Sequence, residues 1–354
     1  MVQPFDAGKL QLRGEPVPLA ERVGTTGSIG IFSVSDAGVL AYRSGPAGTA
    51  PSQPTWFDRE GKVTGTVGEP GSDRGLTLSP DARRAAGRDA AENAAGDIWL
   101  LEFARGVRTR LTFHQGAGSF PVWSPDASHV IFSAGPALDA LFEKASNGAG
   151  EETQVMRQGG RIILPTSWSR DGHFLLFTTA AATGSEQDLW VLPLDGQGSG
   201  KSARLLGAPY NEGLGSFSPD GRWIAYASNE TGRNEVYVRP FVAAGPSLGD
   251  GKWQVSKDGA GGLSAAVLST PRWRADGKEL IYHGPNGAPV AVDVSANGAA
   301  FQPGIPHQLF NPPPNDGWDA TPDGKRFLIQ ILPGQQSAQT PITVVLNWQA
   351  DLKR

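Results

Sequence analysis

Short runs of apolar residues, separated by polar turns, recur along the whole chain. The stretch PVWSPDASHVIF at 121–132 is one copy, with an apolar run, a polar turn and a second apolar run. Related stretches begin at Phe32, Gly75, Pro165, Gly215, Thr270 and Trp318. Apolar runs of this length, bounded by Ser, Pro, Asp and Gly, indicate β-strands joined by tight turns.

The copies align on one aspartate in the turn, and its positions are almost evenly spaced. The aligned residues are Asp36, Asp81, Asp126, Asp171, Asp220, Asp276 and Asp323. Successive intervals are 45, 45, 45, 49, 56 and 47 residues. A period of about 40–45 residues matches a four-stranded propeller blade. Helical repeats would instead need apolar positions with a period of 3.6 residues, which this chain does not show.

Each copy continues with two further strand candidates. Third runs such as 97–103, 188–195 and 235–241 are followed by shorter fourth runs such as 108–113 and 202–207. The predicted fold class is therefore all-β, a β-propeller of four-stranded antiparallel blades. Seven copies predict seven blades in one propeller over 1–354, with residues 1–25 supplying strands that close the ring. The alternatives are six blades, or an incomplete part of a longer propeller region.

The turn sequence SPDG has a direct physical interpretation. Pro presets φ at the second turn position, Asp suits the third, and Gly accepts the left-handed backbone that follows. We expect the Asp carboxylate to accept hydrogen bonds from nearby backbone N–H groups. Ala37, Ala82 and Ala127 occupy the glycine position in three copies, so those turns must be strained or of another type.

An aromatic residue stands three positions before the turn aspartate in four copies. These residues are Trp123, Trp168, Phe217 and Trp273. Large aromatic side chains at one equivalent position per blade predict packing between neighbouring blades, with ligand stacking as the alternative.

Composition and charge exclude several classes of protein. The chain has 354 residues with net charge −4 and no cysteine, so disulfides, thiolate metal sites and a cysteine nucleophile are excluded. Lysine and arginine form no block, and no nucleic-acid partner is expected. No apolar run approaches the roughly 18–20 residues of a membrane span, so direct membrane insertion is not expected. The N-terminal stretch lacks the basic start and apolar core of a signal peptide.

The ordered set of repeats resembles the WD40-like, TolB-type β-propeller repeats of bacteria. It is closer still to the C-terminal propeller of bacterial serine/threonine protein kinases of the acidobacterial type. The stretches that carry this resemblance include VQPFDAGKLQLRGEPVPLAERVG, PTWFDREGK, NEGLGSFSPDGRWIAYASNETGRNEVYVRPF and PITVVLNWQADLK. The resemblance implies a domain that lies outside the cytoplasmic membrane, beyond a kinase domain and a membrane helix. A free-standing chain would instead be cytoplasmic.

Motifs for catalysis are not apparent in the sequence. The glycine-rich loop, H-R-D and D-F-G motifs of a kinase are absent, as is the G-x-S-x-G elbow of a serine hydrolase. The five histidines form no H-E-x-x-H pair, and the turn aspartates are spread around the ring, so we expect no metal and no cofactor. The sequence therefore predicts a protein that is not an enzyme, with no catalytic residues.

The predicted function is a non-catalytic binding or sensor module for an unknown protein, peptide, glycan or small ligand. Loops between a fourth strand and the next first strand gather around the central channel, where a ligand would meet mixed polar and aromatic groups. The candidate ligand-binding residues are Phe120, Arg161, Tyr210, Asn211, Glu212, Asp316 and Trp318. The alternatives are a lactonase-like or hydrolase-like propeller enzyme, or the accessory propeller of a prolyl-oligopeptidase-type peptidase. The oligomeric state is not indicated.

Overall fold

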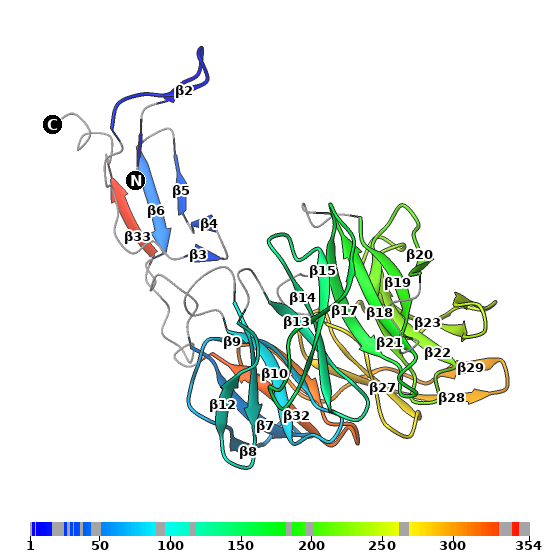
Figure 1. Cartoon of the computed structure of the whole chain (residues 1–354). Helices are drawn as coiled ribbons and strands as arrows, with labels where there is room; N and C mark the ends of the chain where they lie inside the picture. Colours follow the sequence, from blue (N-terminus) through cyan, green and yellow to red (C-terminus); the bar gives the residue numbers. More distant parts are fainter. Residues whose placement is uncertain are drawn as a thin grey trace. The chain divides into compact units, whose positions relative to one another are not determined.

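The chain is organised as two compact units (Figure 1). One comprises Pro51–Leu332, and the other comprises Met1–Ala50 together with Pro333–Arg354. The computed structural model describes residues 2–3, 5–15, 25–26, 29–30, 32–35, 38–43, 51–89, 96–113, 118–181, 186–194, 201–261, 269–332 and 342–346. Every element in this part of the chain is a β-strand, which confirms the all-β prediction.

The smaller unit holds the first sequence repeat. Its strands β5 (Phe32–Val34) and β6 (Val39–Arg43) pair in a three-stranded sheet with β33 (Ile342–Leu346). Two short hairpins are also present, β1 (Phe5–Asp6) with β2 (Gln11–Leu12) and β3 (Thr25–Thr26) with β4 (Ile29–Gly30). Asp36 and Ala37 of this repeat lie outside the described residues.

Among its described residues, the larger unit contains six sheets of four or five strands. In three of them the four strands lie side by side in chain order. The first contains β9 (Asp73–Leu78), β10 (Arg84–Asp89), β11 (Ile98–Glu102) and β12 (Val107–Arg110), and the second contains β13 (Ser119–Trp123), β14 (His129–Ala134), β15 (Ala140–Ala145) and β16 (Thr153–Arg157). The third contains β17 (Ile162–Trp168), β18 (Phe174–Ala180), β19 (Asp188–Pro193) and β20 (Ala203–Leu206). The prediction of antiparallel four-stranded blades is thus confirmed.

In the next two sheets the fourth strand is divided into two short pieces. One sheet contains β21 (Glu212–Phe217), β22 (Trp223–Ser228), β23 (Glu235–Val242), β24 (Ser247–Leu248) and β25 (Trp253–Gln254). The other contains β26 (Arg272–Trp273), β27 (Glu279–His283), β28 (Pro289–Asn297), β29 (Ala300–Pro303) and β30 (His307–Gln308).

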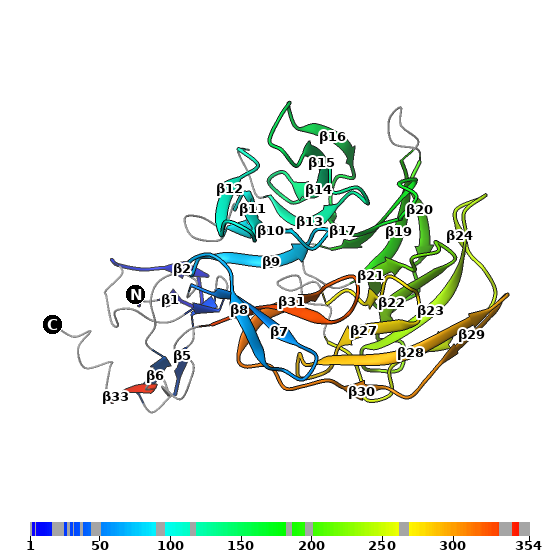
Figure 2. The same cartoon turned by 90° about the horizontal axis from the view of Figure 1, so that it is seen from below.

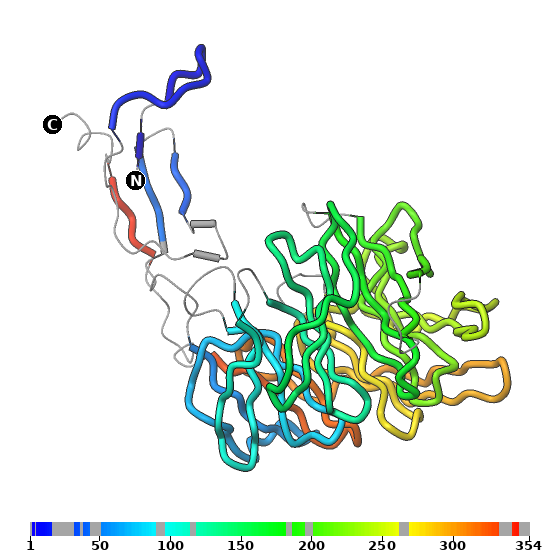
Figure 3. Tube along the Cα trace, in the orientation of Figure 1, coloured from blue at the N-terminus to red at the C-terminus, as the bar shows by residue number. Residues whose placement is uncertain are grey.

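The sixth sheet joins the two ends of the larger unit. It contains β31 (Asn315–Ala320), β32 (Arg326–Ile331), β7 (Gln53–Asp58) and β8 (Val63–Thr66), in that order. The register pairs Phe327 with Phe57, and Figure 3 shows the early and late parts of the chain side by side here. The strands that close this sheet are thus β7 and β8, whereas the predicted closing residues 1–25 lie in the other unit. The predicted count of seven blades is not confirmed.

Burial explains why the second strands β14, β18 and β22 of their sheets are apolar on both faces. Every residue of β22 is buried, and so are all but the first residue of β14 and β18. The fourth strands β12 and β16 are largely exposed. A sheet covered on both faces by neighbouring sheets needs continuous apolar runs rather than alternation, which is what the second strands provide.

The aromatic residues before the turns pack between sheets, as predicted. Trp123 at the end of β13 contacts a cluster that includes Ile98 of β11 and Phe132 of β14, and Phe217 belongs to a cluster with Leu189 of β19. Figure 2 shows the first strands β9, β13, β17, β21 and β31 toward the middle of the unit and later strands such as β12, β16 and β20 farther out. The first strands therefore surround a common centre.

Candidate ligand-binding channel

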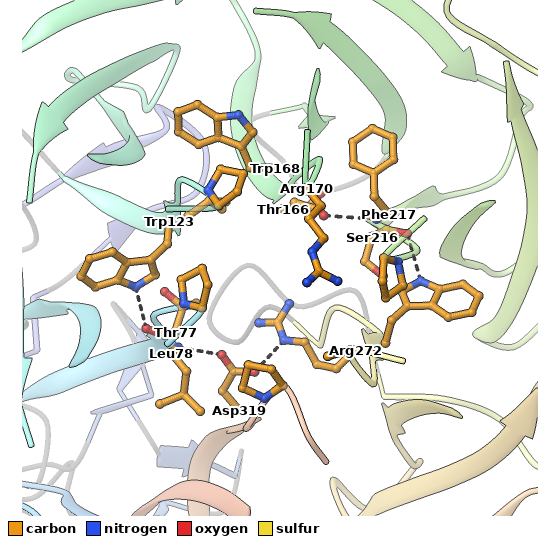
Figure 4. A pocket seen from close by; sticks show the side chains of 18 of the residues that line it. Thr77, Leu78, Trp123, Thr166, Trp168, Arg170, Ser216, Phe217, Arg272 and Asp319 are labelled. Atoms are coloured by element: carbon orange, nitrogen blue, oxygen red, sulfur yellow. Dashed lines mark hydrogen bonds and ion pairs between the residues drawn. The ribbon is translucent and has the colours of Figure 1, made fainter. Parts of the chain in front are cut away.

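A channel with a volume of about 460 Å³ opens at the centre of the larger unit (Figure 4). Its walls come from the ends of all six first strands and from the turns that follow them. The turns are held by the predicted bonds: the Asp126 Oδ1 accepts from Ser124 Oγ at 2.6 Å and from Ser128 N–H at 3.0 Å. These bonds hold the pKa of the Asp126 carboxyl at about 2. The same bond joins Ser79 to Asp81, Ser169 to Asp171, Ser218 to Asp220 and Thr321 to Asp323, so five of the turns around the opening are fixed in this way.

One position of the repeat supplies a ring of residues to this channel. It is the residue four places before the turn aspartate, and its six occupants are Thr77, Val122, Ser167, Ser216, Arg272 and Asp319. Four of the six are uncharged. The two charged members, Arg272 on β26 and Asp319 on β31, come from adjacent sheets.

Asp319 connects three sheets through its carboxylate. Its Oδ1 accepts from Arg272 Nε at 2.6 Å, and its Oδ2 accepts from the backbone N–H of Leu78 on β9 at 2.8 Å. The Oδ1 also accepts from Ala320 N–H at 2.9 Å. The Asp319 side chain is 6% exposed and that of Arg272 is 25% exposed. The pair thus holds the Arg272 guanidinium at the channel wall with one edge still open to the channel.

Arg170 is the third charged residue of the channel. It stands immediately before the turn residue Asp171, where four other turns carry Pro80, Pro125, Pro219 and Pro322. Arg170 is exposed, and it makes no hydrogen bond or ion pair with the part of the chain that the structure describes. In Figure 4 the guanidinium groups of Arg170 and Arg272 point toward one another. Two cations therefore face a common space.

The remaining wall is formed mainly by proline rings and indole carbons. The Nε1 groups of Trp123 and Trp273 donate to the backbone carbonyls of Thr77 at 3.0 Å and Ser216 at 3.3 Å. Trp168 Nε1 donates to Gly172 O at 3.0 Å. Because these N–H groups are used inside the protein, the indoles offer a ligand only carbon surface. The Ser216 Oγ is buried and has no hydrogen-bond partner among the described residues.

None of the residues predicted from the sequence lines this channel. Arg161 and Asn211 directly precede β17 and β21, at the ends of these strands opposite the channel, whereas Phe120 and Trp318 lie within β13 and β31, each beside a lining residue. Arg161 forms an ion pair with Asp188 at 3.5 Å, and Asn211 Oδ1 accepts from the backbone N–H of Gln187 at 3.1 Å. Glu212 is 3% exposed, and burial raises the pKa of its carboxyl. Phe120 and Tyr210 are half-buried and exposed, respectively. Their participation in binding stays a prediction.

Asp316 and Trp318 have structural partners. Asp316 forms an ion pair with Arg74 Nε at 2.7 Å. Trp318 is 6% exposed, its ring stacks on His283 at 3.9 Å, and its Nε1 donates to Gly287 O at 2.9 Å. The Trp318 ring is therefore buried in packing and not presented at a mouth.

Sequence reasoning missed Arg170, Arg272 and Asp319, although a signal for them was present. When the repeats are aligned on the turn aspartate, Arg170 replaces a proline that recurs in four other turns. At another aligned position, Arg272 and Asp319 replace the small or apolar residues of the other repeats. A departure from the repeat at one position indicates a local requirement that the fold itself does not impose.

The described residues show neither a metal-binding cluster nor a membrane-spanning helix. They contain no group of three or more His, Cys, Asp or Glu side chains that could hold a metal ion. Within the same residues, no helix is long and apolar enough to cross a membrane.

Comparison with known proteins supports the fold. The solved structure of a putative TolB from Agrobacterium tumefaciens aligns with 81% of this chain and 100% of its own, with 16% identity and a TM-score of 0.56. The chain folds as a TolB-type β-propeller. No protein-family model matches it.

Two curated relatives match part of the sequence. A protein TolB homolog of Chlorobium luteolum is 30% identical over 146 residues, which is 40% of this chain and 31% of that protein. The uncharacterized peptidase YuxL of Bacillus subtilis is 25% identical over 190 residues, which is 43% of this chain and 29% of that protein. The matches thus span about a third of the length of each relative.

The second relative corrects one prediction. The sequence predicted a protein that is not an enzyme, but the similar stretch in YuxL belongs to a protein named as a peptidase. The prediction is contradicted because a propeller without catalytic motifs of its own can still be part of an enzyme.

Proposed function

We propose that the propeller is a binding module that takes a peptide into the central channel at the face formed by the turns between first and second strands. The observation that carries the proposal is the convergence of six first strands on an open space of about 460 Å³. Ligand sites in proteins are typically clefts of roughly 300–1,000 Å³ with mainly apolar walls and a few polar groups, and this channel has that composition.

A peptide is favoured over a glycan by the walls of the channel. A glycan site needs polar partners for many hydroxyl groups and open aromatic faces. Of the four aromatic residues that line the channel, Trp123 and Phe217 are 5% and 7% exposed and Trp168 and Trp273 are half-buried, so none offers a fully open ring face. Proline rings and buried indole edges instead suit apolar side chains of a peptide, since such contacts release water from apolar surface on both partners.

The similarity to a protein named as a peptidase supports the same ligand class. A propeller attached to a peptidase would meet peptides before or during their cleavage. The resemblance to the propeller of bacterial serine/threonine kinases supports a second setting, in which the bound peptide is a signal and the domain lies outside the cytoplasmic membrane. In both settings the proposed ligand of the channel is a peptide.

A random heptapeptide library tests the proposal. Immobilised protein is expected to enrich a defined set of sequences, and Ala275→Trp is expected to abolish the enrichment. Ala275 is exposed and lies on the channel wall, so an indole there narrows the opening without entering the core. Ala243→Trp is the matched control, because Ala243 is also exposed but is not a lining residue.

The result expected is enrichment by the native protein and Ala243→Trp but not by Ala275→Trp. Equal enrichment by all three proteins would place binding elsewhere and contradict the proposal. No enrichment by any of them would also count against a peptide-binding channel.

A further inference from the structure

We propose that the channel recognises a carboxylate of its peptide ligand, and that Arg170 and Arg272 hold this carboxylate between them. The inference rests on the proposed function and adds the chemical group that is recognised. Its basis is a pair of facing guanidinium groups whose charge the described lining residues balance only in part.

The charge of the channel is positive. Its charged lining residues are Arg170, Arg272 and Asp319. The Asp319 carboxylate receives three hydrogen bonds, from Arg272 Nε, Leu78 N–H and Ala320 N–H, so its oxygens are already engaged. One negative charge therefore faces two positive charges, and the uncompensated charge lies on the side of Arg170.

The donors that remain are suited to a carboxylate. Arg272 uses Nε for Asp319, and its Nη1 and Nη2 groups make no hydrogen bond to the described residues. All donors of the Arg170 guanidinium are free in the same sense. A guanidinium presents paired N–H groups that match the two oxygens of a carboxylate, and such charge-assisted bonds are among the strongest in proteins.

The facing arrangement itself favours an anion. Two like charges that point toward one another repel, most strongly where water is partly displaced, and an anion between them changes repulsion to attraction on both sides. Asp319 fixes Arg272 in this orientation through bonds to a second and a third sheet. The Arg272 half of the site is thus organised before a ligand arrives, which lowers the entropic cost of binding, whereas Arg170 becomes ordered when the ligand binds.

A single carboxylate fits better than a phosphate-rich polymer. The excess is one positive charge in the channel, and the chain as a whole carries net charge −4, which repels polyanions at longer range. The apolar walls suit the residues on either side of an acidic side chain. Ser216 Oγ, buried and without a partner among the described residues, is a further polar group at the wall.

The repeat offers a variant, Arg170→Pro, that separates an effect on binding from an effect on folding. Arg170→Pro gives this turn the proline that four other turns of the protein carry and makes residues 169–172 identical in sequence to 218–221, so we expect the backbone conformation to accept proline. A compatible proline reduces the entropy of the unfolded chain, so we expect equal or higher thermal stability. Loss of binding in this variant could not then be attributed to unfolding.

Two fluorescent peptides serve as probes, acetyl-Ala-Pro-Glu-Leu-Ala-amide and the same peptide with Gln in place of Glu. We expect the native protein to bind the Glu peptide at least about 10-fold more tightly, the discrimination that a charge-assisted pair provides. Arg170→Pro and Arg272→Gln are each expected to reduce this preference to near unity. Arg222→Gln is the matched control, because Arg222 is on an equivalent turn, pairs with Asp220 and does not line the channel.

The outcomes separate this inference from the proposed function. Equal binding of both peptides by the native protein, with both blocked in Ala275→Trp, would overturn the carboxylate inference and leave the peptide site intact. Displacement of the Glu peptide by millimolar inorganic phosphate would show that the anion is phosphate, which also overturns it. If Arg222→Gln lowered the preference for the Glu peptide as much as Arg170→Pro, the arginines would act only through the general surface charge, and this would contradict the inference. Absence of binding by either peptide, with no library enrichment, would contradict both proposals.

Discussion

Arg59 and Glu279 form a two-point ion pair between the sheet that closes the larger unit and the sheet beside it. Arg59 follows β7 and Glu279 begins β27. The Nη2–Oε1 and Nη1–Oε2 distances are both 2.8 Å, and the Glu279 side chain is 3% exposed. Arg59 Nη1 also donates to the backbone carbonyl of Gly324 at 2.8 Å. The Arg59 side chain thus joins the closing sheet to the neighbouring sheet through Glu279, and also binds the turn between β31 and β32 through Gly324.

Removing Arg59 should weaken the closed unit. Arg59→Ala leaves the buried Glu279 carboxylate with Arg274 at 3.5 Å as its remaining ion-pair partner. Because Arg59 is 26% exposed, we expect a loss of about 2 kcal/mol, less than the roughly 3–5 kcal/mol of a fully buried pair. Denaturant unfolding followed by tryptophan fluorescence measures it. Arg105→Ala, which breaks an exposed pair with Glu102, should have a much smaller effect; similar losses in both variants would contradict the special role of Arg59.

The turns that carry alanine offer a stabilising change. The φ angles of Ala82 and Ala127 are 53° and 59°, so these residues adopt the left-handed conformation that glycine adopts in the other turns. The sequence left open whether these turns are strained or of another type, and the positive φ angles show strain at Ala82 and Ala127. We expect Ala82→Gly to stabilise the protein by about 0.5–1 kcal/mol, since the relief of left-handed strain of about 1–2 kcal/mol outweighs the entropy cost of glycine.

Thermal unfolding checks this prediction. A melting temperature that rises for Ala82→Gly, but falls for Gly221→Ala in an equivalent turn with φ of 70°, is the expected pair of results. Destabilisation by Ala82→Gly would show that the methyl group of Ala82 contributes packing that exceeds the strain.

The repeat was enough to predict the blade, because its determinants are local. A turn needs Asp126 beside Ser124, and the strands around it need apolar residues such as Val130 and Phe132. How the ring closes is a long-range property. The stretch QPTWFD at β7 follows β6 in the chain, but it pairs with β32 near the other end of the sequence, and no local pattern distinguishes these partners.

The residues predicted for the candidate site do not line the central channel, and their part in binding stays a prediction. Glu212 and Trp318 looked exposed in a loop, but each begins or lies within a strand where neighbouring sheets cover it. Polar and aromatic composition alone does not distinguish a binding group from a buried group that is satisfied internally. The position of Arg272 in the channel could not be predicted from its own repeat, because it depends on Asp319 and Arg170, which come from two other repeats.

Buried His283 should make stability depend on pH. Burial lowers the pKa of His283 to about 3, and the charge of Arg272 acts in the same direction. In the unfolded chain the pKa is near its ordinary value of about 6.5, so between these values the unfolded state binds a proton that the folded state does not. The free energy of unfolding should therefore fall as pH is lowered from about 6.5, by up to about 1.4 kcal/mol per pH unit.

His283→Phe isolates this contribution, because phenylalanine retains a ring that can stack on Trp318. Unfolding by denaturant at about pH 7 and about pH 5, which bracket the unfolded-state pKa, should show a clear loss for the native protein and a smaller loss for the variant. The turn aspartates, whose pKa values are lowered, lose their contribution only at lower pH, below about 4. An identical dependence in both proteins over this interval would rule out His283 as its source.

Asp319 should affect stability and ligand selectivity by separable routes. Asp319→Ala removes the acceptor for Leu78 N–H and the partner of Arg272, and we expect it to cost about 2 kcal/mol, as for a hydrogen-bonded charged group. Asp319→Asn keeps an oxygen for Leu78 N–H and should cost less. In both variants Arg272 loses its ionic partner and its fixed orientation.

The loss of Asp319 also leaves the channel with one more uncompensated positive charge. The affinity for the Glu peptide falls if the fixed orientation of Arg272 decides binding, and it rises if the net charge of the channel decides binding. We expect a fall, because a guanidinium that must be ordered on binding loses the advantage of a preformed site. Fluorescence titration at two salt concentrations distinguishes the routes, since a gain that disappears at high salt would assign Asp319 a purely electrostatic effect.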